Sequence, residues 1–395
     1  MNQAVEIPVL LRYAFRPFFL LTGLYAVLSV AAWAGFLLAE WPLPLGVSPV
    51  QWHSHEMLYG LVPAAIAGFL LTAMTNWTQA RPLQGTGLLL LILLWVAGRV
   101  VMWFAGWLPA WLVAAVDFVF LPVLGIYVAS ILIRHRNHRN LILIVVLALL
   151  AAGNLLMHLG FTTHNDTLLK LGQLLGFDVI AVLMLVIGGR IIPAFSANWL
   201  RAKGGNPDWV KRSDLLDRLA IASVILLLPL DGFGASAQLT GSAALFAGLV
   251  NLVRLVRWAG WRVAAEPLLW ILHLAYAFIV LAFLLRGASA FSNLIPATAW
   301  EHLLGVGGIG TLILAVMTRV AMGHTGRPLV LRPMGVWIYV AILLATLLRT
   351  TVALQLMDFR VGVMLAALCW VLAFGLFVIL YFPILSSPRA DGRPG

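Results

Sequence analysis

The chain carries very little charge for its length of 395 residues. Only 10% of its residues are Asp, Glu, Lys or Arg, whereas 63% are hydrophobic. Soluble domains have about 25% charged residues, so this composition argues against an ordinary soluble protein. The mean hydropathy of +1.01 is instead typical of a polytopic helical membrane protein.

Cysteine is almost absent as well, since Cys369 is the one cysteine in the sequence. It cannot form an intrachain disulfide, and by itself it cannot supply the ligands of an iron–sulfur cluster. A cleavable signal peptide is also not evident, because Arg12 and Arg16 lead directly into a full-length hydrophobic stretch. We therefore expect the N-terminal segment to be retained.

What the sequence does contain is twelve hydrophobic stretches, each near the 20 residues that a helical span needs. They lie at about 15–39, 54–76, 85–105, 109–133, 141–161, 168–192, 216–233, 236–256, 267–286, 299–322, 331–351 and 361–383. The stretch at 216–233 is the weakest, because it is short and contains Asp217 and Arg218. We predict an all-α, polytopic transmembrane helical bundle of twelve spans, with one domain at 1–386 and a disordered tail at 387–395.

The basic residues give this bundle an orientation. The net charge is +11, but Lys and Arg are spread over many short loops, which favours membrane orientation over nucleic-acid binding. With the N-terminus inside, 18 Lys or Arg fall in the predicted cytoplasmic segments and four in the opposite loops. Because positive residues mark the cytoplasmic side, we predict that both termini are cytoplasmic.

Two of the predicted spans end alike. Span 54–76 reaches Met74-Thr75 and then Arg81-Pro82-Leu83, and span 299–322 reaches Met317-Thr318 and then Arg327-Pro328-Leu329. Span 168–192 lies midway between them and matches in part. The similarity favours three repeats of four helices, and internal repeats are known in membrane proteins. The alternative is a chance likeness among apolar helices.

Five ionisable side chains share one predicted outer layer of the membrane: His53, His55, Glu56, His158 and His302. An ionisable residue within a membrane is a functional-site hypothesis by default. Imidazole suits copper, zinc and iron, and three imidazoles suit copper, so we predict a copper site made by His53, His55 and His302. Glu56 would orient a histidine or carry protons. The alternative is that these histidines form only interhelical hydrogen bonds.

The His-x-His spacing sets a condition on this site. Residues two apart on an α-helix point about 200° apart. His53 and His55 can therefore hold one ion only if the segment is extended or the helix begins near His55.

A second group lies at the predicted inner side. His273 and His324 could supply axial nitrogens to a haem, and the buried Arg190 and Arg319 could pair with its propionates. The alternative for the arginines is that they extend to the membrane surface from near a helix end. The buried acids Asp117 and Asp178 either pair with an arginine or carry protons.

Several of these segments together resemble the NnrS family, bacterial polytopic proteins linked to the nitric oxide response. One of them is Trp52-His53-Ser54-His55-Glu56-Met57. The matching segments follow the family's order and lie at 15–19, 52–57, 68–73, 76–78, 188–190, 193–196, 266–273, 316–319 and 323–328. The chain departs from the family pattern where Met74 and Thr75 replace a Val-Pro pair.

The resemblance implies a bacterial inner-membrane protein with twelve spans. It also implies that the protein binds copper and a haem of b type. Its implied role is protection against nitric oxide and nitrosative stress, as in denitrification. One alternative is a quinol-dependent enzyme like nitric oxide reductase, with Glu56 and Asp117 delivering protons. The other alternative is a transporter or metal carrier. The expected partners are nitric oxide and the lipid bilayer. The enzymatic alternative adds quinol as a partner. Nucleic acid is not an expected partner.

Overall fold

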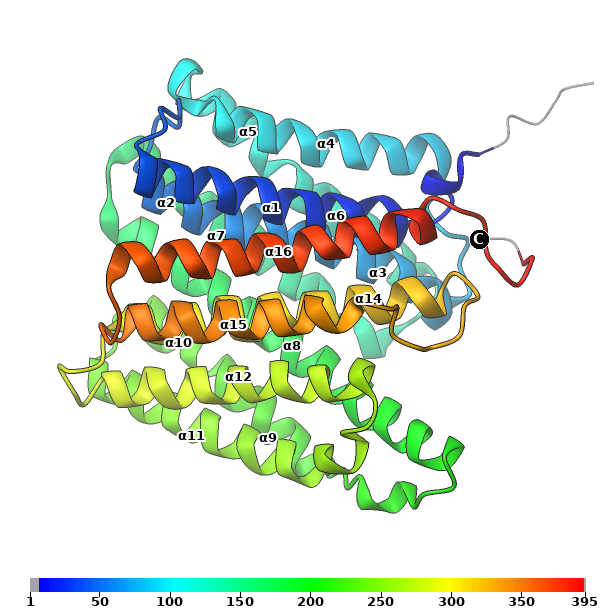
Figure 1. The fold of residues 1–395 in the computed structure, drawn as a ribbon. Coiled ribbons are helices and arrows are strands. Elements are labelled where there is room, and N and C mark those ends of the chain that lie inside the picture. The colour runs from blue at the N-terminus through cyan, green and yellow to red at the C-terminus, as the bar shows by residue number, and fades with distance from the viewer. Residues whose placement is uncertain (1–6, 394–395) are drawn as a thin grey trace, which may run out of the picture. The chain divides into compact units, whose positions relative to one another are not determined.

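The computed structural model describes residues 7–393, and regular secondary structure in this part of the chain is entirely helical (Figure 1). The first half contains α1 (Phe15–Ala39), α2 (Pro49–His55), α3 (Val62–Thr78), α4 (Gly85–Trp103), α5 (Ala110–Phe118), α6 (Phe120–Arg134), α7 (Ile142–Thr163) and α8 (Asp166–Ala202). The second half contains α9 (Asp214–Ile225), α10 (Leu227–Gly232), α11 (Ala237–Arg257), α12 (Pro267–Ser289), α13 (Ala297–His302), α14 (Thr311–Gly323), α15 (Gly335–Ala353) and α16 (Phe359–Leu385). The all-α prediction is confirmed.

Two π-helical turns join short helices to long ones. The turn Glu56–Leu61 connects α2 to α3, and the turn Leu303–Gly310 connects α13 to α14. Each π turn begins directly after a histidine, His55 in the first case and His302 in the second. Turns of this kind are rare in proteins, and those that occur often lie at functional sites.

Among residues 7–393, eleven helices are long and apolar enough to cross a membrane. The weak stretch at 216–233 accounts for the difference from twelve, because it forms α9 and α10, two shorter helices interrupted at Leu226. Pro229 explains the interruption, since its ring collides with the carbonyl four residues earlier and it has no N–H to donate. A polytopic membrane protein is therefore confirmed, while the count of twelve and the three repeats stay predictions.

The chain divides into two compact units, which we describe separately. Unit 1 comprises residues 1–176, 319–329 and 374–395, and unit 2 comprises residues 177–318 and 330–373. In unit 1, α1 packs on α3, α4 on α5, and α6 on α7. In unit 2, α11 packs on both α9 and α12. The single transmembrane domain that the sequence predicts stays a prediction.

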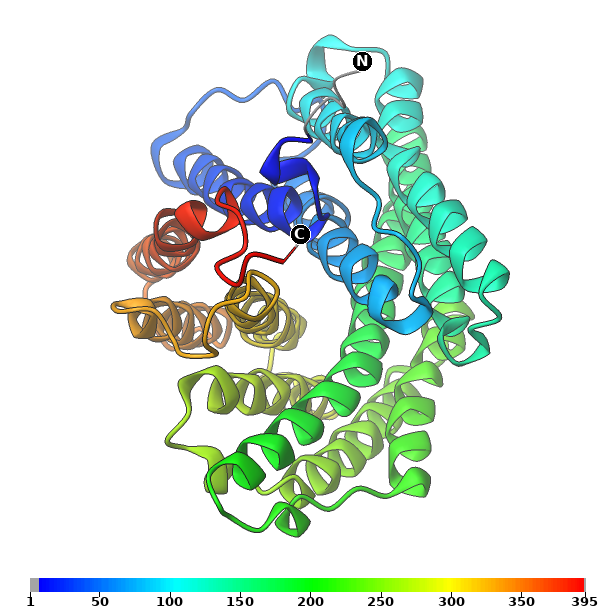
Figure 2. The same cartoon turned by 90° about the vertical axis from the view of Figure 1, so that its right-hand side faces the viewer.

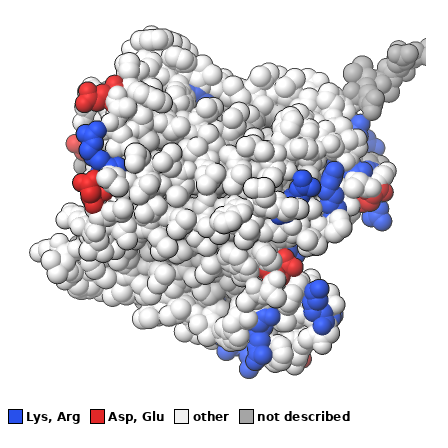
Figure 3. All heavy atoms as spheres, in the orientation of Figure 1, with Lys and Arg blue, Asp and Glu red and all other residues white. Residues whose placement is uncertain are grey.

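The surface of the helices agrees with a lipid environment. Figure 3 shows that uncharged side chains cover the sides of the helices on the face drawn, while Lys, Arg, Asp and Glu gather at helix ends and loops. Large apolar side chains such as Leu90, Ile126 and Ile379 are more than half exposed. Such continuous exposure of apolar side chains indicates contact with the bilayer.

The C-terminal segment, predicted to be disordered from residue 387, makes specific contacts as far as the structure describes it. In Figure 2 it crosses the end of α14, where Arg389 donates to the carbonyl of His324 at 2.9 Å. The backbone N–H of Ala390 donates to the carbonyl of Thr325, also at 2.9 Å. Outside the membrane spans, a hydrogen bond from Arg389 lowers the pKa of Asp391 to about 2.

Candidate metal centre

Helix α2 determines where its two histidines point. The Ser48 hydroxyl accepts a hydrogen bond from the Gln51 N–H, and Pro49 follows in the first helical position, so the helix begins well before His53. Both histidines are therefore helical and diverge. The His53 ring stacks on Trp33, with centroids 4.3 Å apart, whereas His55 is completely buried in another direction.

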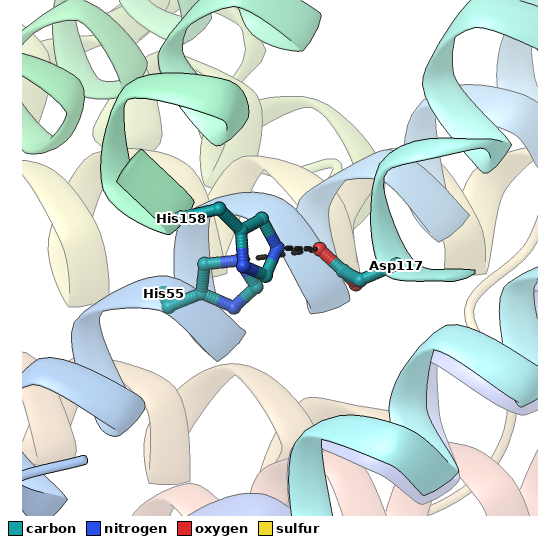
Figure 4. Close-up of side chains that lie close together, drawn as sticks. All are labelled: His55, Asp117 and His158. Atoms are coloured by element: carbon teal, nitrogen blue, oxygen red, sulfur yellow. Dashed lines mark hydrogen bonds and ion pairs between the residues drawn. The ribbon is translucent and has the colours of Figure 1, made fainter. Parts of the chain in front are cut away.

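His55 meets two residues from other helices of unit 1 (Figure 4). Asp117 comes from α5 and His158 from α7. The distance from Asp117 Oδ2 to His158 Nε2 is 2.8 Å, and its distance to His55 Nε2 is 3.3 Å. One possible ligand atom from each of the three side chains lies within 4.8 Å of the others. The three side chains are almost fully buried.

Hydrogen bonds to neighbouring side chains hold the three residues in place. Glu56 Oε1 lies 2.8 Å from His55 Nδ1, and Asn154 donates to Asp117 Oδ2 at 2.9 Å. A metal-binding histidine usually donates its second ring N–H to a carboxylate, which fixes its tautomer and orientation. Glu56 can do this for His55 by accepting from Nδ1, while Nε2 lies 2.8 Å from Asn154 Oδ1 and 3.3 Å from Asp117 Oδ2.

Arg99 of α4 joins the two carboxylates. It donates to Glu56 Oε2 at 2.6 Å and also contacts Asp117 Oδ1, while Tyr25 contacts Glu56 as well. Gly60 leaves room for this arrangement, since a Cβ at that position would lie 2.3 Å from Arg99 Nη1. With neutral histidines, two carboxylates face one guanidinium. The remaining negative charge is balanced either by a second proton on His55, whose two ring nitrogens both face acceptor oxygens, or by a bound cation.

The donor set decides which cations fit. Two imidazole nitrogens and one carboxylate oxygen suit copper, zinc or non-haem iron, and they do not suit magnesium or calcium, which prefer oxygen ligands. Copper binds such sites most tightly among the common divalent metals. The residues present therefore fit a copper ion.

The predicted outer layer is brought together only in part. His55, Glu56 and His158 are neighbours, whereas the ring of His53 is turned to Trp33. His302 belongs to unit 2, where its Nδ1 lies 2.7 Å from the carbonyl of Thr298 on its own helix. The site of His53, His55 and His302 stays a prediction. The helical geometry of α2 argues against the first two sharing an ion.

The residues predicted to hold haem are divided between the units. In unit 2, His273 is 8% exposed, and its Nε2 lies 3.0 Å from Ser196 Oγ. Its Nδ1 has no hydrogen-bond partner among residues 7–393 and faces Gly260, where a Cβ would lie 2.7 Å away. Arg190 belongs to the same unit, on α8.

The other two predicted haem residues, His324 and Arg319, belong to unit 1. The His324 ring lies 5.7 Å from that of Phe15. Burial and the nearby Arg389 lower the pKa of His324, so its ring is neutral at pH 7 and able to act as a ligand. The assignment of all four residues to haem stays a prediction.

Sequence reasoning did not place Asp117 and His158 in a metal site. Their signals were nevertheless visible, because His158 falls in the predicted outer layer and Asp117 is a charge within an apolar stretch. Of the two roles predicted for the buried acids, pairing with arginine is confirmed. Asp117 pairs with Arg99, and Asp178 pairs with Arg286.

Comparison with known proteins supplies the family. The comparison with curated proteins found no match. The model of one family, described as NnrS protein, matches residues 9–389, which is nearly the whole chain. The chain therefore belongs to the NnrS family of membrane proteins.

Proposed function

We propose that this protein binds haem and copper in the bacterial inner membrane, with both termini cytoplasmic, and protects the cell against nitric oxide. The observation that carries the proposal is the buried convergence of His55, Asp117 and His158, whose atoms fit a copper ion. The family name points to the nitric oxide response. We place the copper at these three residues.

Copper in this site would supply a redox-active ion able to bind a diatomic gas. The chain's own residues prepare the site in three ways. Glu56 orients the His55 ring, Arg99 balances part of the carboxylate charge, and Asn154 holds Asp117. Because the cluster is almost fully buried, bulk water is excluded, and electrostatic interactions within it are stronger than in solution.

The haem part of the proposal rests on the family and on residue chemistry. His273 and His324 are the proposed ligands or close neighbours of the haem, with Arg190 and Arg319 near its propionates. A guanidinium is a natural partner for a carboxylate, because it donates two parallel hydrogen bonds. The buried Nδ1 of His273, which has no hydrogen-bond partner among the residues that the structure describes, supports its role as a ligand.

The proposal is tested on the purified full-length protein by its optical spectrum and its metal content. We expect a haem Soret band that shifts when nitric oxide binds, together with bound copper. A protein that carries neither haem nor copper after expression with both supplied would contradict the proposal. Sustained anaerobic consumption of nitric oxide with a quinol donor would identify the enzymatic alternative, a nitric oxide reductase-like oxidoreductase.

Replacing His324 by alanine should abolish or shift the Soret band, because a haem nitrogen ligand is lost, and Arg319→Ala should weaken haem retention. His135→Ala is the matched control, since His135 lies in an exposed turn and should leave the spectrum unchanged. A His324→Ala protein with normal haem and reduced copper would show that the two cofactors occupy the opposite sites.

A further inference from the structure

Unit 2 contains a buried group of charges that the proposed function does not use. Arg286 of α12 donates to Asp178 Oδ1 of α8 at 2.7 Å, and its other terminal nitrogen contacts Asp231 Oδ2 of α10. The Trp300 ring covers the guanidinium, with the Arg286 Cζ 4.6 Å from the ring centroid. Two carboxyl groups therefore share one guanidinium in a largely buried group.

Arg286 holds the two carboxyl groups together, because its two terminal nitrogens each contact an oxygen of a different one. Asp178 Oδ2 is buried and has no N–H or O–H donor among residues 7–393. If both carboxyl groups were ionised beside one guanidinium, one negative charge would remain uncompensated in a largely buried site, which is costly. A proton on one carboxyl removes this charge and gives that group an O–H that can donate a hydrogen bond. It also makes the sum of charges in the group zero, as burial demands.

We propose that Asp178 and Asp231 form a proton-binding site, in which the pair holds one proton beside Arg286. One carboxyl group of this site is more deeply buried than the other. The side chain of Asp178 is 1% exposed and that of Asp231 is 13% exposed. Asp231 also lies just before the exposed turn at Phe233. A proton from water therefore reaches Asp231 first and passes from it to Asp178.

The groups packed around Asp178 and Asp231 are either uncharged or already paired, so they do not compete for this proton. Among residues 7–393, the charged partner of Asp178 is Arg286, which also pairs with Asp231, and Trp300 and Phe177 pack near them as uncharged rings. On α11, Arg254 is paired with Asp217 at 2.7 Å and does not enter the group. No residue is shared with the proposed copper or haem sites, so the inference stands independently of the proposed function.

Infrared difference spectroscopy of the full-length protein in lipid tests the site through the C=O stretching band of a protonated carboxylic acid. At neutral pH the wild type should show this band, and it should shift in heavy water. Asp178→Asn and Asp231→Asn should each remove it, because the remaining carboxylate then pairs alone with Arg286 and ionises. The wild-type band should also disappear at high pH.

Asp217→Asn is the matched control, since Asp217 has its own arginine, and this variant should keep the band. Arg286→Met should increase the band, because both carboxyl groups then hold protons. A wild-type protein without a band of this kind would overturn the proposal. A band that stays unchanged in both Asp178→Asn and Asp231→Asn would overturn it too. The wild-type measurement decides the question even if a variant fails to fold.

Discussion

His55→Ala protein should lose its copper and keep most of its haem. The substitution removes one of the three ligand atoms and also the ring that Glu56 and Asn154 hold in place. Asp117→Asn and His158→Ala should have the same effect, because each supplies another ligand atom. Glu56→Gln should weaken copper binding by about 10–100-fold, as is usual when the partner that orients a metal-binding histidine is changed. Metal analysis of the purified variants measures all four effects.

His53→Ala and His302→Ala are the controls that separate the two possible ligand sets. Both should retain copper, since His53 is stacked on Trp33 and His302 contacts its own helix. Loss of copper from these two variants, with copper retained in His158→Ala, would refute the site of His55, Asp117 and His158. That result would support the three-histidine site that the sequence predicts.

Arg99→Met should be among the most destabilising substitutions in the chain. It leaves Glu56 and Asp117 buried and adjacent with no guanidinium between them. Breaking a buried ion pair by removing one partner costs about 3–5 kcal/mol. The free energy of unfolding, measured in lipid or detergent, should fall by about this amount.

Two further variants check the physical reason for this loss. Arg332→Met makes the same substitution at an exposed loop position, and should change the free energy of unfolding by less than about 0.5 kcal/mol. Combining Arg99→Met with Glu56→Gln removes the charge of one of the two carboxylates that lose their guanidinium. Part of the lost free energy of unfolding should therefore return. An Arg99→Met protein as stable as the Arg332→Met protein would show that Arg99 does not compensate this pair.

Helix positions were largely predictable because local composition controls them. The predicted stretch 85–105 corresponds to α4 (Gly85–Trp103), and 267–286 corresponds to α12 (Pro267–Ser289). The length of an apolar run and the proline or glycine at its start are enough to find such helices. The stretch at 216–233 shows the limit, since Pro229 interrupts it and leaves two short helices.

The candidate site was predictable only in its chemistry. Pairing with an arginine was one of the two roles that the sequence allowed for the buried Asp117, and Arg99 is the arginine that it meets. That the same carboxylate also meets His55 and His158 did not follow, because these residues lie on three different helices. A membrane helix is apolar on nearly all sides, so its sequence pattern does not show which face meets which neighbour.

The sequence by itself determined that this is an all-helical membrane protein of the NnrS family, because apolar length and ordered motifs are properties of the chain alone. The tertiary structure decided which polar groups meet. Helix α2 begins at Pro49 and turns His53 towards Trp33, while His55 joins Asp117 and His158. The physical reason is that contacts between helices depend on rotation about each axis and on depth along it, and hydropathy specifies neither.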